Sequence, residues 1–412
     1  MRSVLRVFLP ILTAAALLLP GFARAGEEPD GDGLRFAADG SFTIMLLSDA
    51  QDTQYPPAFL TRSIEAVLSS YKVDLVVLLG NQLEGGSPVL RIGNNAKNVE
   101  KALTRLLDPL KEAGRPFAFV YGSQDYLAPL GMDNQTAIYR RYDNCVTPAF
   151  DESGAYYLDV YPYQGDAAAL RLYFFASGPD FGDSGQGAAS QEQVAWYTQT
   201  SSALRAQSGM ETVPAVAFVH APVAEVYGLF TEVPADTPSA LARGGKSYLP
   251  NKKRIFIGAA NEAPSPAAYN YGLYGALVAQ GDVFLLMSGS DHNNSFIGAL
   301  GGIDLGAAPG SSYTSYGGAE ERGVRLLRFY EDDVRSYDTI HVRYADFLQT
   351  RGLSALRYYL STTSRIPNYV KTLASFLLLL AAIALIARLA IRAARRPRPA
   401  EEEGDPGFDD AL

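Results

Sequence analysis

Short apolar runs that end directly in polar residues constrain the fold of this chain more than any other feature. The runs are rich in aromatic and β-branched residues, which is typical of buried strands. They are Phe42–Leu47, Leu75–Leu79, Phe117–Tyr121, Leu170–Phe175, Val213–Val219 and Val283–Ser288. Because ligands of α/β sheets bind at the carboxyl ends of strands, the polar residues after these runs are candidate site residues.

Helix-like segments alternate with these runs. Their apolar side chains recur at helical spacing, and their other positions hold good helix formers. The segments are Ser63–Tyr71, Val99–Ala113 and Gln191–Arg205. Because strands and helices alternate along the chain, we predict an α/β fold.

Stretches rich in glycine and proline interrupt this order and are predicted to be long loops. They are Gly178–Gly187, Glu232–Pro250, Ala259–Tyr271 and Gly298–Gly318, and they carry or adjoin Tyr269, Tyr271, Tyr274, Tyr313 and Tyr316. Long loops are uncommon in compact domains unless they cover a site or bind something. These loops therefore either border a site or decorate the surface.

The N-terminal segment is typical of a secretory signal peptide. Met1–Arg6 is basic, Val7–Pro20 is apolar, and Ala23–Ala25 is an A-x-A cleavage signal. We predict that residues 1–25 are removed after Ala25. An uncleaved anchor is the alternative, but the apolar run is shorter than the ~20 residues that span a bilayer.

A second apolar segment, Tyr369–Ile391, is predicted to be one C-terminal transmembrane helix, with a buried core helix as the alternative. Arginines follow it, and basic flanks stay in the cytoplasm. We therefore expect a single-pass protein of the cell membrane, with the ectodomain outside, a cytoplasmic tail over 392–412 and a juxtamembrane segment over 344–368. That segment is either an amphipathic helix at the membrane surface or a helical stalk.

The net charge limits the possible binding partners, and the cysteine content limits the possible disulfides. The formal net charge of −9 becomes about −11 between the two end segments, which disfavours nucleic acid and anionic lipid as partners. Cys145 is the only cysteine, so the chain forms no intrachain disulfide. Cys145 is expected to act as a small buried apolar residue.

Five strand-end blocks, in this order, resemble those of calcineurin-like metallophosphoesterases, particularly the branch near purple acid phosphatases. The blocks are Phe42–Asp49, Asp74–Asn81, Phe117–Asp125, Phe218–Pro222 and Gly289–His292, and Gln193–Tyr197 resembles a helix of that branch. The resemblance implies a sandwich of two mixed β-sheets flanked by helices over residues 38–343. It also implies a site built from residues far apart in the chain.

The resemblance implies that the first two blocks have lost metal ligands. Such enzymes hold two metal ions, bridged by a carboxylate, that activate water and clamp the phosphate. The first block usually reads Asp-x-His, but here Asp49 is followed by Gln51, and a neutral amide is a poor transition-metal ligand. The second usually supplies the bridging aspartate, which Asn81 replaces.

The remaining blocks keep only part of the set that the resemblance implies. Ser123 stands in place of a metal-binding asparagine, and Gln124 in place of the catalytic histidine; a glutamine cannot titrate as an acid near neutral pH. His220 matches a ligand of the second metal and His292 a ligand of the first, whereas Ser290 replaces a histidine. Asp49, His220 and His292 are thus the residual ligands.

Each residual ligand also has a plain structural interpretation, as a hydrogen-bonded histidine or a turn-capping aspartate. A weak single-metal site made by Asp49 and His292 is also conceivable. Asp52, Asp125 and Asp291 adjoin the lost positions and are interpreted either as an oxygen-rich site for a hard cation or as turn and capping residues. His341 matches no block, and we assign it no role.

Two functions follow from the sequence. The first is a membrane-anchored, extracytoplasmic, catalytically degenerate domain that binds an unknown ligand or protein, with no metal or one weakly bound divalent ion. The second is a metal-dependent phosphoesterase with an atypical site, which would need two divalent metals such as Mn, Fe or Zn. The number of lost positions favours the first.

Overall fold

The computed structural model describes residues 33–55, 58–150, 154–179, 187–209, 212–347 and 368–394. The predicted signal peptide, and nearly all of the juxtamembrane segment and the tail, lie outside these residues. Contacts divide the chain into two units, one up to Arg365 and one from Ile366 onward. The second unit is described by the helix α9 (Asn368–Ala394).

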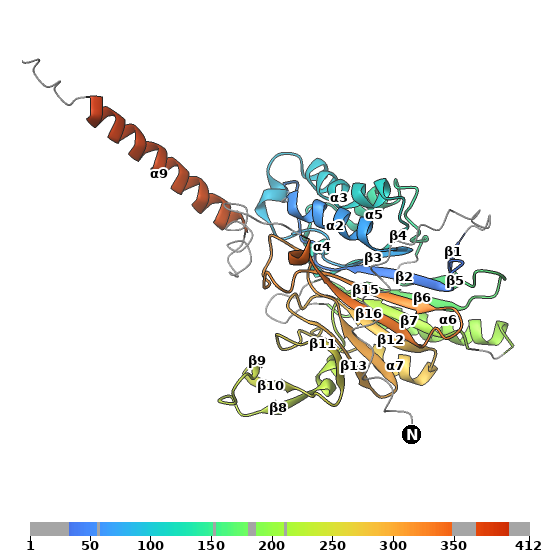
Figure 1. Ribbon diagram of the computed structural model, residues 1–412. Helices are drawn as coiled ribbons and strands as arrows, with labels where there is room; N and C mark the ends of the chain where they lie inside the picture. Colours follow the sequence, from blue (N-terminus) through green and yellow to red (C-terminus); the bar gives the residue numbers. More distant parts are fainter. Residues whose placement is uncertain are drawn as a thin grey trace, which may run out of the picture. The chain divides into compact units, whose positions relative to one another are not determined.

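The first unit contains two large mixed β-sheets, as the resemblance implies (Figure 1). The five-stranded sheet has the order β16-β15-β2-β3-β4 and the eight-stranded sheet has the order β1-β5-β6-β7-β12-β14-β13-β11. The strands of the five-stranded sheet are β2 (Ser41–Leu47), β3 (Leu75–Leu79), β4 (Phe117–Val120), β15 (Gly323–Tyr330) and β16 (Tyr337–Arg343). Those of the eight-stranded sheet are β1 (Leu34–Arg35), β5 (Tyr156–Tyr161), β6 (Leu170–Phe175), β7 (Ala215–Val219), β11 (Ile255–Ala259), β12 (Val283–Ser288), β13 (Ser295–Leu300) and β14 (Ile303–Ala307).

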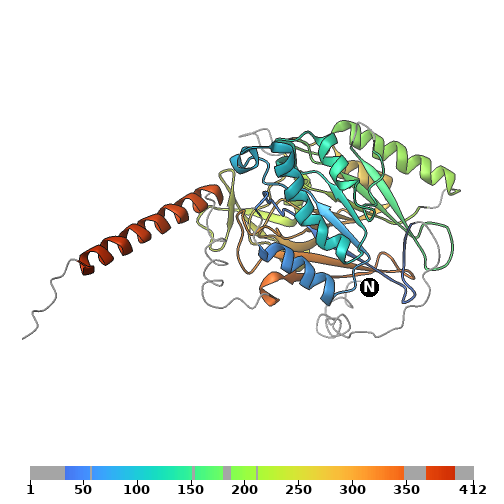
Figure 2. The ribbon, with the colours of Figure 1, turned by 90° about the horizontal axis from the view of Figure 1, so that it is seen from above.

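Helices cover the outer face of each sheet (Figure 1, and from above in Figure 2). The α-helices are α2 (Ala58–Ser70), α3 (Asn95–Glu112), α4 (Ser123–Leu127), α5 (Met132–Tyr139), α6 (Gln191–Gln207) and α7 (Leu273–Gln280). Short 3-10 helices are η1 (Pro88–Arg91), η3 (Ala224–Leu229) and η4 (Tyr344–Asp346). The Asn94 side chain caps α3 by accepting from the Lys97 amide, as N-caps commonly do.

The alternation of side chains along buried strands explains the layers. In β2, Ile44 and Leu46 belong to a core shared by both sheets, whereas Met45 and Leu47 pack under α2 and α3. Because successive side chains of a strand point to opposite faces, one apolar run fills two cores. The sheets therefore face each other, and helices form the outer layers.

The predicted loops are partly wrong. Glu232–Pro250 contains most of a three-stranded sheet, made of β8 (Phe230–Val233), β9 (Leu241–Arg243) and β10 (Lys246–Pro250). Gly298–Gly318 contains the end of β13 and all of β14. Paired glycines with positive φ, Gly244–Gly245 and Gly301–Gly302, lie between adjacent strands. They suit tight hairpin turns, so these glycines join strands.

The predicted C-terminal span is not supported as a membrane helix. The segment is helical, because α9 covers Tyr369–Ile391. In the part of the chain that the structure describes, however, no helix is long and apolar enough to cross a membrane. Lys371, Arg388 and Arg392 lie within α9 near its ends.

Candidate functional site

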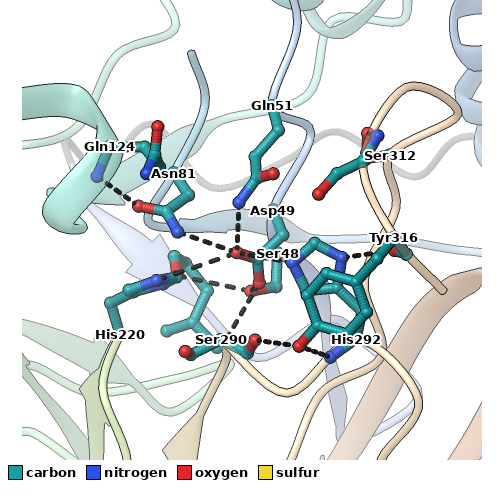
Figure 3. A network of polar contacts seen from close by, with 12 residues as sticks. Ser48, Asp49, Gln51, Asn81, Gln124, His220, Ser290, His292, Ser312 and Tyr316 are labelled. Atoms are coloured by element: carbon teal, nitrogen blue, oxygen red, sulfur yellow. Dashed lines mark hydrogen bonds and ion pairs between the residues drawn. The ribbon is translucent and has the colours of Figure 1, made fainter. Parts of the chain in front are cut away.

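The strand ends bring the predicted site residues together at one edge of the sandwich (Figure 3). Asp49 follows β2, Asn81 follows β3, and Gln124 lies in the first turn of α4 after β4. His220 follows β7, and Ser290 and His292 follow β12. The parallel pairing of β2 with β3 and of β7 with β12 directs these ends to the same edge.

The centre of the site is the fully buried carboxylate of Asp49. Its Oδ1 atom lies 3.3 Å from His292 Nε2 and 3.7 Å from His220 Nε2. Burial by itself would raise the pKa of Asp49, but the charge of His292 and the hydrogen bonds from His292 and Ser48 lower it well below its ordinary value. Asp49 is therefore a carboxylate anion.

The residues that replace metal ligands donate hydrogen bonds to this anion. Asn81 Nδ2 donates to Asp49 Oδ1 at 3.0 Å, and Gln51 Nε2 donates to the same oxygen at 3.3 Å. The backbone amide of Ser290 donates to Oδ2 at 2.9 Å, and Ser48 Oγ donates to Oδ2 at 2.6 Å. The carboxylate is thus surrounded by donors, where the family places cations.

The orientation of the Asn81 amide group is fixed by a neighbour. Its Oδ1 atom accepts from the backbone amide of Gln124 at 2.9 Å. A backbone N–H can only donate, so the Asn81 side chain must present its NH₂ group to Asp49. Asn81 therefore occupies the bridging position of the family as a hydrogen-bond donor.

His292 supplies the positive charge of the site. Its Nδ1 atom lies 2.7 Å from the carbonyl oxygen of Tyr316 and its Nε2 atom faces Asp49, so both nitrogens face acceptors. Burial lowers the pKa of His292, but Asp49 and the Tyr316 carbonyl outweigh burial and raise it. This geometry favours the imidazolium form, stacked on the ring of Tyr316 at a centroid distance of 4.1 Å.

His220 differs from His292 in its charge. Its Nδ1 atom lies 2.7 Å from the carbonyl oxygen of Leu79, which fixes the tautomer that carries a proton on Nδ1. Burial lowers the pKa of His220, and Asp49 offsets this only in part. His220 is thus a neutral, hydrogen-bonded residue with its Nε2 lone pair toward Asp49.

The backbone at the site has an uncommon conformation. Asp49, Gln51, Asn81 and Ser290 have positive φ angles of 52°, 41°, 54° and 69°. Residues other than glycine rarely adopt positive φ angles, and such backbone strain clusters at functional sites. The strained backbone is present although the family's ligands at Gln51, Asn81 and Ser290 are absent.

Comparisons with known proteins agree with the resemblance drawn from the strand-end blocks. The protein named probable inactive purple acid phosphatase 28 of Arabidopsis thaliana is 24% identical over 322 residues, which cover 69% of this chain and 74% of the relative. Probable inactive purple acid phosphatase 14 of the same plant is 25% identical over 323 residues, with the same coverages of 69% and 74%. The homologues of this chain are purple acid phosphatase-like proteins.

No family model matches the chain. Among solved structures, a dimetal phosphatase from Danio rerio aligns with 73% of this chain and 98% of its own length. The identity is 13% and the TM-score is 0.43. The two mixed sheets and the flanking helices described above are those that the resemblance of the strand-end blocks implies.

The side chains present do not fit the family's pair of metal ions. Among the described residues, no three histidine, cysteine, aspartate or glutamate side chains are placed to hold a metal ion. The N–H groups of Asn81, Gln51 and Ser290 turn the positive ends of their dipoles toward Asp49, and a dication there would be repelled. The assignment of Asp49, His220 and His292 as residual metal ligands stays a prediction.

The other acidic candidates do not form a separate cation site. Asp125 accepts hydrogen bonds from the backbone amides of Asn81, Leu83 and Gly122 and so acts as a capping residue. Burial raises the pKa of Asp125 to about 7. Asp291 similarly accepts from the Ser265 amide, and burial raises its pKa to about 8. Asp52 is buried, but its carboxylate oxygens have no hydrogen-bond partner among the described residues.

The remaining substituted positions lie beside Asp49 without contacting it through their side chains. Gln124 Oε1 accepts from the amide of Gly86 at 3.3 Å, and Ser123 is buried in the first turn of α4. His341 is in β16, outside this cluster. No role was predicted for Ser48 or Tyr316 from the sequence, although Tyr316 is in a loop predicted either to border a site or to decorate the surface.

Proposed function

We propose that this protein is a noncatalytic phosphoesterase-fold domain that binds a ligand or a partner protein. The observation that carries the proposal is the saturation of Asp49 by donors. An imidazolium, two side-chain amides, a hydroxyl and a backbone amide already satisfy its two oxygens. The names of its relatives, probable inactive purple acid phosphatases, support the same proposal.

The side chains at this site do not supply the metal ligands that the chemistry of the family requires. Activation of water requires a metal ion that lowers the pKa of that water, and a bridging anion to hold two ions together. Asn81 supplies a neutral amide at the bridging position, and its NH₂ group is directed at Asp49. Gln124 supplies an amide that cannot transfer a proton near neutral pH.

Restoring the family's residues tests this proposal. The combined variant Gln51→His, Asn81→Asp, Ser123→Asn, Gln124→His and Ser290→His should bind two metal ions per chain after dialysis, because the backbone at Gln51, Asn81 and Ser290 already has the strained, positive-φ conformation that clusters at functional sites. Single reversions should do little, since a two-metal site acts as a unit. The wild type should hydrolyse phosphomonoesters and diesters no faster than buffer containing Mn, Zn, Fe or Mg.

An atypical single-metal phosphoesterase is the second candidate. Its support is the orientation of the two histidines, whose Nε2 atoms face Asp49 while Nδ1 is held by a carbonyl, an arrangement common in metal-binding imidazoles. Metal retained by the dialysed wild type, together with turnover abolished by Asp49→Ala, would establish this candidate and exclude the first.

We also propose a cellular location for this protein. Residues 1–25 direct secretion, the domain lies outside the cell, and α9 attaches it to the cell membrane with the C-terminus inside. The support is the exposed apolar surface of α9, where Leu378 is 71% and Ile386 66% exposed, and the arginines that follow. Protease added to intact cells should remove the domain and spare the tail, whereas a protected domain would reverse the orientation.

A further inference from the structure

A buried arginine lies between the two sheets. Arg325, on β15, has no exposed surface. Its Nη1 atom donates to Thr339 Oγ1 of β16 at 2.9 Å, and its Nη2 atom donates to Ser295 Oγ of β13 at 2.7 Å. Its Nε atom is buried without a hydrogen-bond partner. The guanidinium thus links the two sheets through neutral hydroxyls.

The positive charge of Arg325 has no acidic partner within the described residues. Other arginines of the domain, such as Arg171 with Asp159, form ion pairs, whereas Arg325 forms none. A buried charge is costly unless it is paired and hydrogen-bonded, and hydroxyl groups leave the charge uncompensated. The interior beside Arg325 is therefore suited to an anion.

A second buried nitrogen without a hydrogen-bond partner lies on the strand beside Arg325. His341 of β16 pairs with Arg325 of β15 in antiparallel register, so both side chains lie on the same face of the sheet. The Nε2 atom of His341 is a second buried nitrogen without a partner. Burial lowers the pKa of His341 to about 3, with further lowering by Arg325 and Arg343. The ring is neutral, and Arg325 is the charged group.

We propose that a small inorganic anion of the halide class binds Arg325 between β15 and β13. The anion accepts a hydrogen bond from Nε–H, and a water molecule that it orients donates to His341 Nε2. A single negative charge matches the single uncompensated guanidinium, whereas a dianionic phosphate would leave charge unpaired. The proposal does not depend on the proposed function.

Thermal unfolding of the full chain tests the proposal with sodium bromide and sodium chloride as probes. Sodium gluconate at equal ionic strength is the reference, because gluconate is too large for the interior. Each tenfold rise in halide above its dissociation constant should raise the unfolding midpoint by about 2 °C. Arg325→Met, which keeps an apolar stem, should unfold at the same temperature in halide and gluconate.

Arg328→Met is the matched control, because Arg328 is on the same strand but is paired with Asp39 near the surface. This variant should keep the halide response of the wild type. If Arg325→Met fails to fold, anomalous scattering from wild-type crystals grown in bromide decides. A bromide peak beside Arg325 Nε supports the proposal. A water molecule there, or equal midpoints in halide and gluconate, overturns it.

Discussion

Removal of the Asp49 carboxylate should destabilise the protein. In Asp49→Ala, the Asn81 amide, the Ser290 amide and the His292 imidazolium would remain buried without an acceptor. Breaking a buried charge pair in this way costs about 3–5 kcal/mol. Urea unfolding of the wild type and the variant measures the difference.

The control for this substitution is Asp332→Ala, since Asp332 is exposed in a turn between β15 and β16. Its unfolding free energy should change by less than about 0.5 kcal/mol. A stabilising effect of Asp49→Ala would contradict the network, because it would mean that Asp49 is held at a cost, as an unfilled metal ligand is.

Two glycines with similar φ angles allow the cost of backbone strain to be measured separately from the cost of close packing. Gly80 has a φ of +87°, and a Cβ atom there would lie 2.5 Å from His220 Nδ1. Gly93 has a φ of +82° with no atom within 4 Å of such a Cβ. Gly93→Ala should therefore cost about 1–2 kcal/mol from strain, and Gly80→Ala about 1–3 kcal/mol more from overpacking. Equal costs in thermal or urea unfolding would show that the His220 ring moves aside.

The positions of the site residues could be predicted from the sequence, but their contacts could not. Asp49, Asn81 and His220 each follow an apolar run within two residues, so their place at the strand ends is a local property. The hydrogen bonds to Asp49 depend on rotamers and on partners far along the chain, such as Tyr316 beside His292. No pattern in the sequence encodes those pairings.

At the scale of elements, β16 should make the protein sensitive to acid. The pKa of His341 is lowered from 6.5 to about 3, because the side chain is buried and faces arginines. The unfolded chain therefore binds this proton at a higher pH than the folded chain does. Stability from His341 is complete above pH 6.5 and falls as the pH drops toward 3, by at most about 1.4 kcal/mol per pH unit.

Substitution of His341 by Gln should reduce that pH dependence. Urea unfolding of both proteins at several pH values between 4 and 7, in chloride-free buffer, measures it. The difference in unfolding free energy between wild type and His341→Gln should shrink as the pH falls. A constant difference across this range would show that the histidine stays protonated or becomes exposed in the folded protein.

The elements that the sequence predicted well are buried on both faces. β3, β6 and β12 match the predicted runs residue for residue, because a strand between a helix layer and a second sheet is apolar at nearly every position. β16 was missed, since most of its residues are only partly buried. β15 was missed too, because buried Arg325 interrupts its apolar pattern.

At the scale of the molecule, the core between the sheets should make the first unit fold by itself. Residues of both sheets, among them Phe42, Val77, Phe174 and Phe218, form one buried cluster. Deletion of residues 366–412 should change the unfolding midpoint by less than about 2 °C, because α9 belongs to a separate unit. Calorimetry measures this, and a large loss would show that α9 packs on the domain.

The face-to-face arrangement of the two sheets could be predicted from the resemblance, since the five blocks must meet at one edge. The eight-stranded width of one sheet and the additional three-stranded sheet did not follow. The extra strands of both are short or rich in glycine, and two of the pairings, β9 with β10 and β13 with β14, are set by hairpin turns. A single sequence shows such turns only as glycine pairs.

The backbone amides around the buried carboxylates have a consequence for hydrogen exchange. Loop amides ordinarily exchange quickly, but the N–H groups of Asn81, Gly122 and Ser290 are bonded to buried side-chain oxygens. Their protons can exchange with solvent only when the surrounding strands separate. The loops at this edge should therefore exchange as slowly as β2 and β7, and an experiment that maps slow amides would count them with the core.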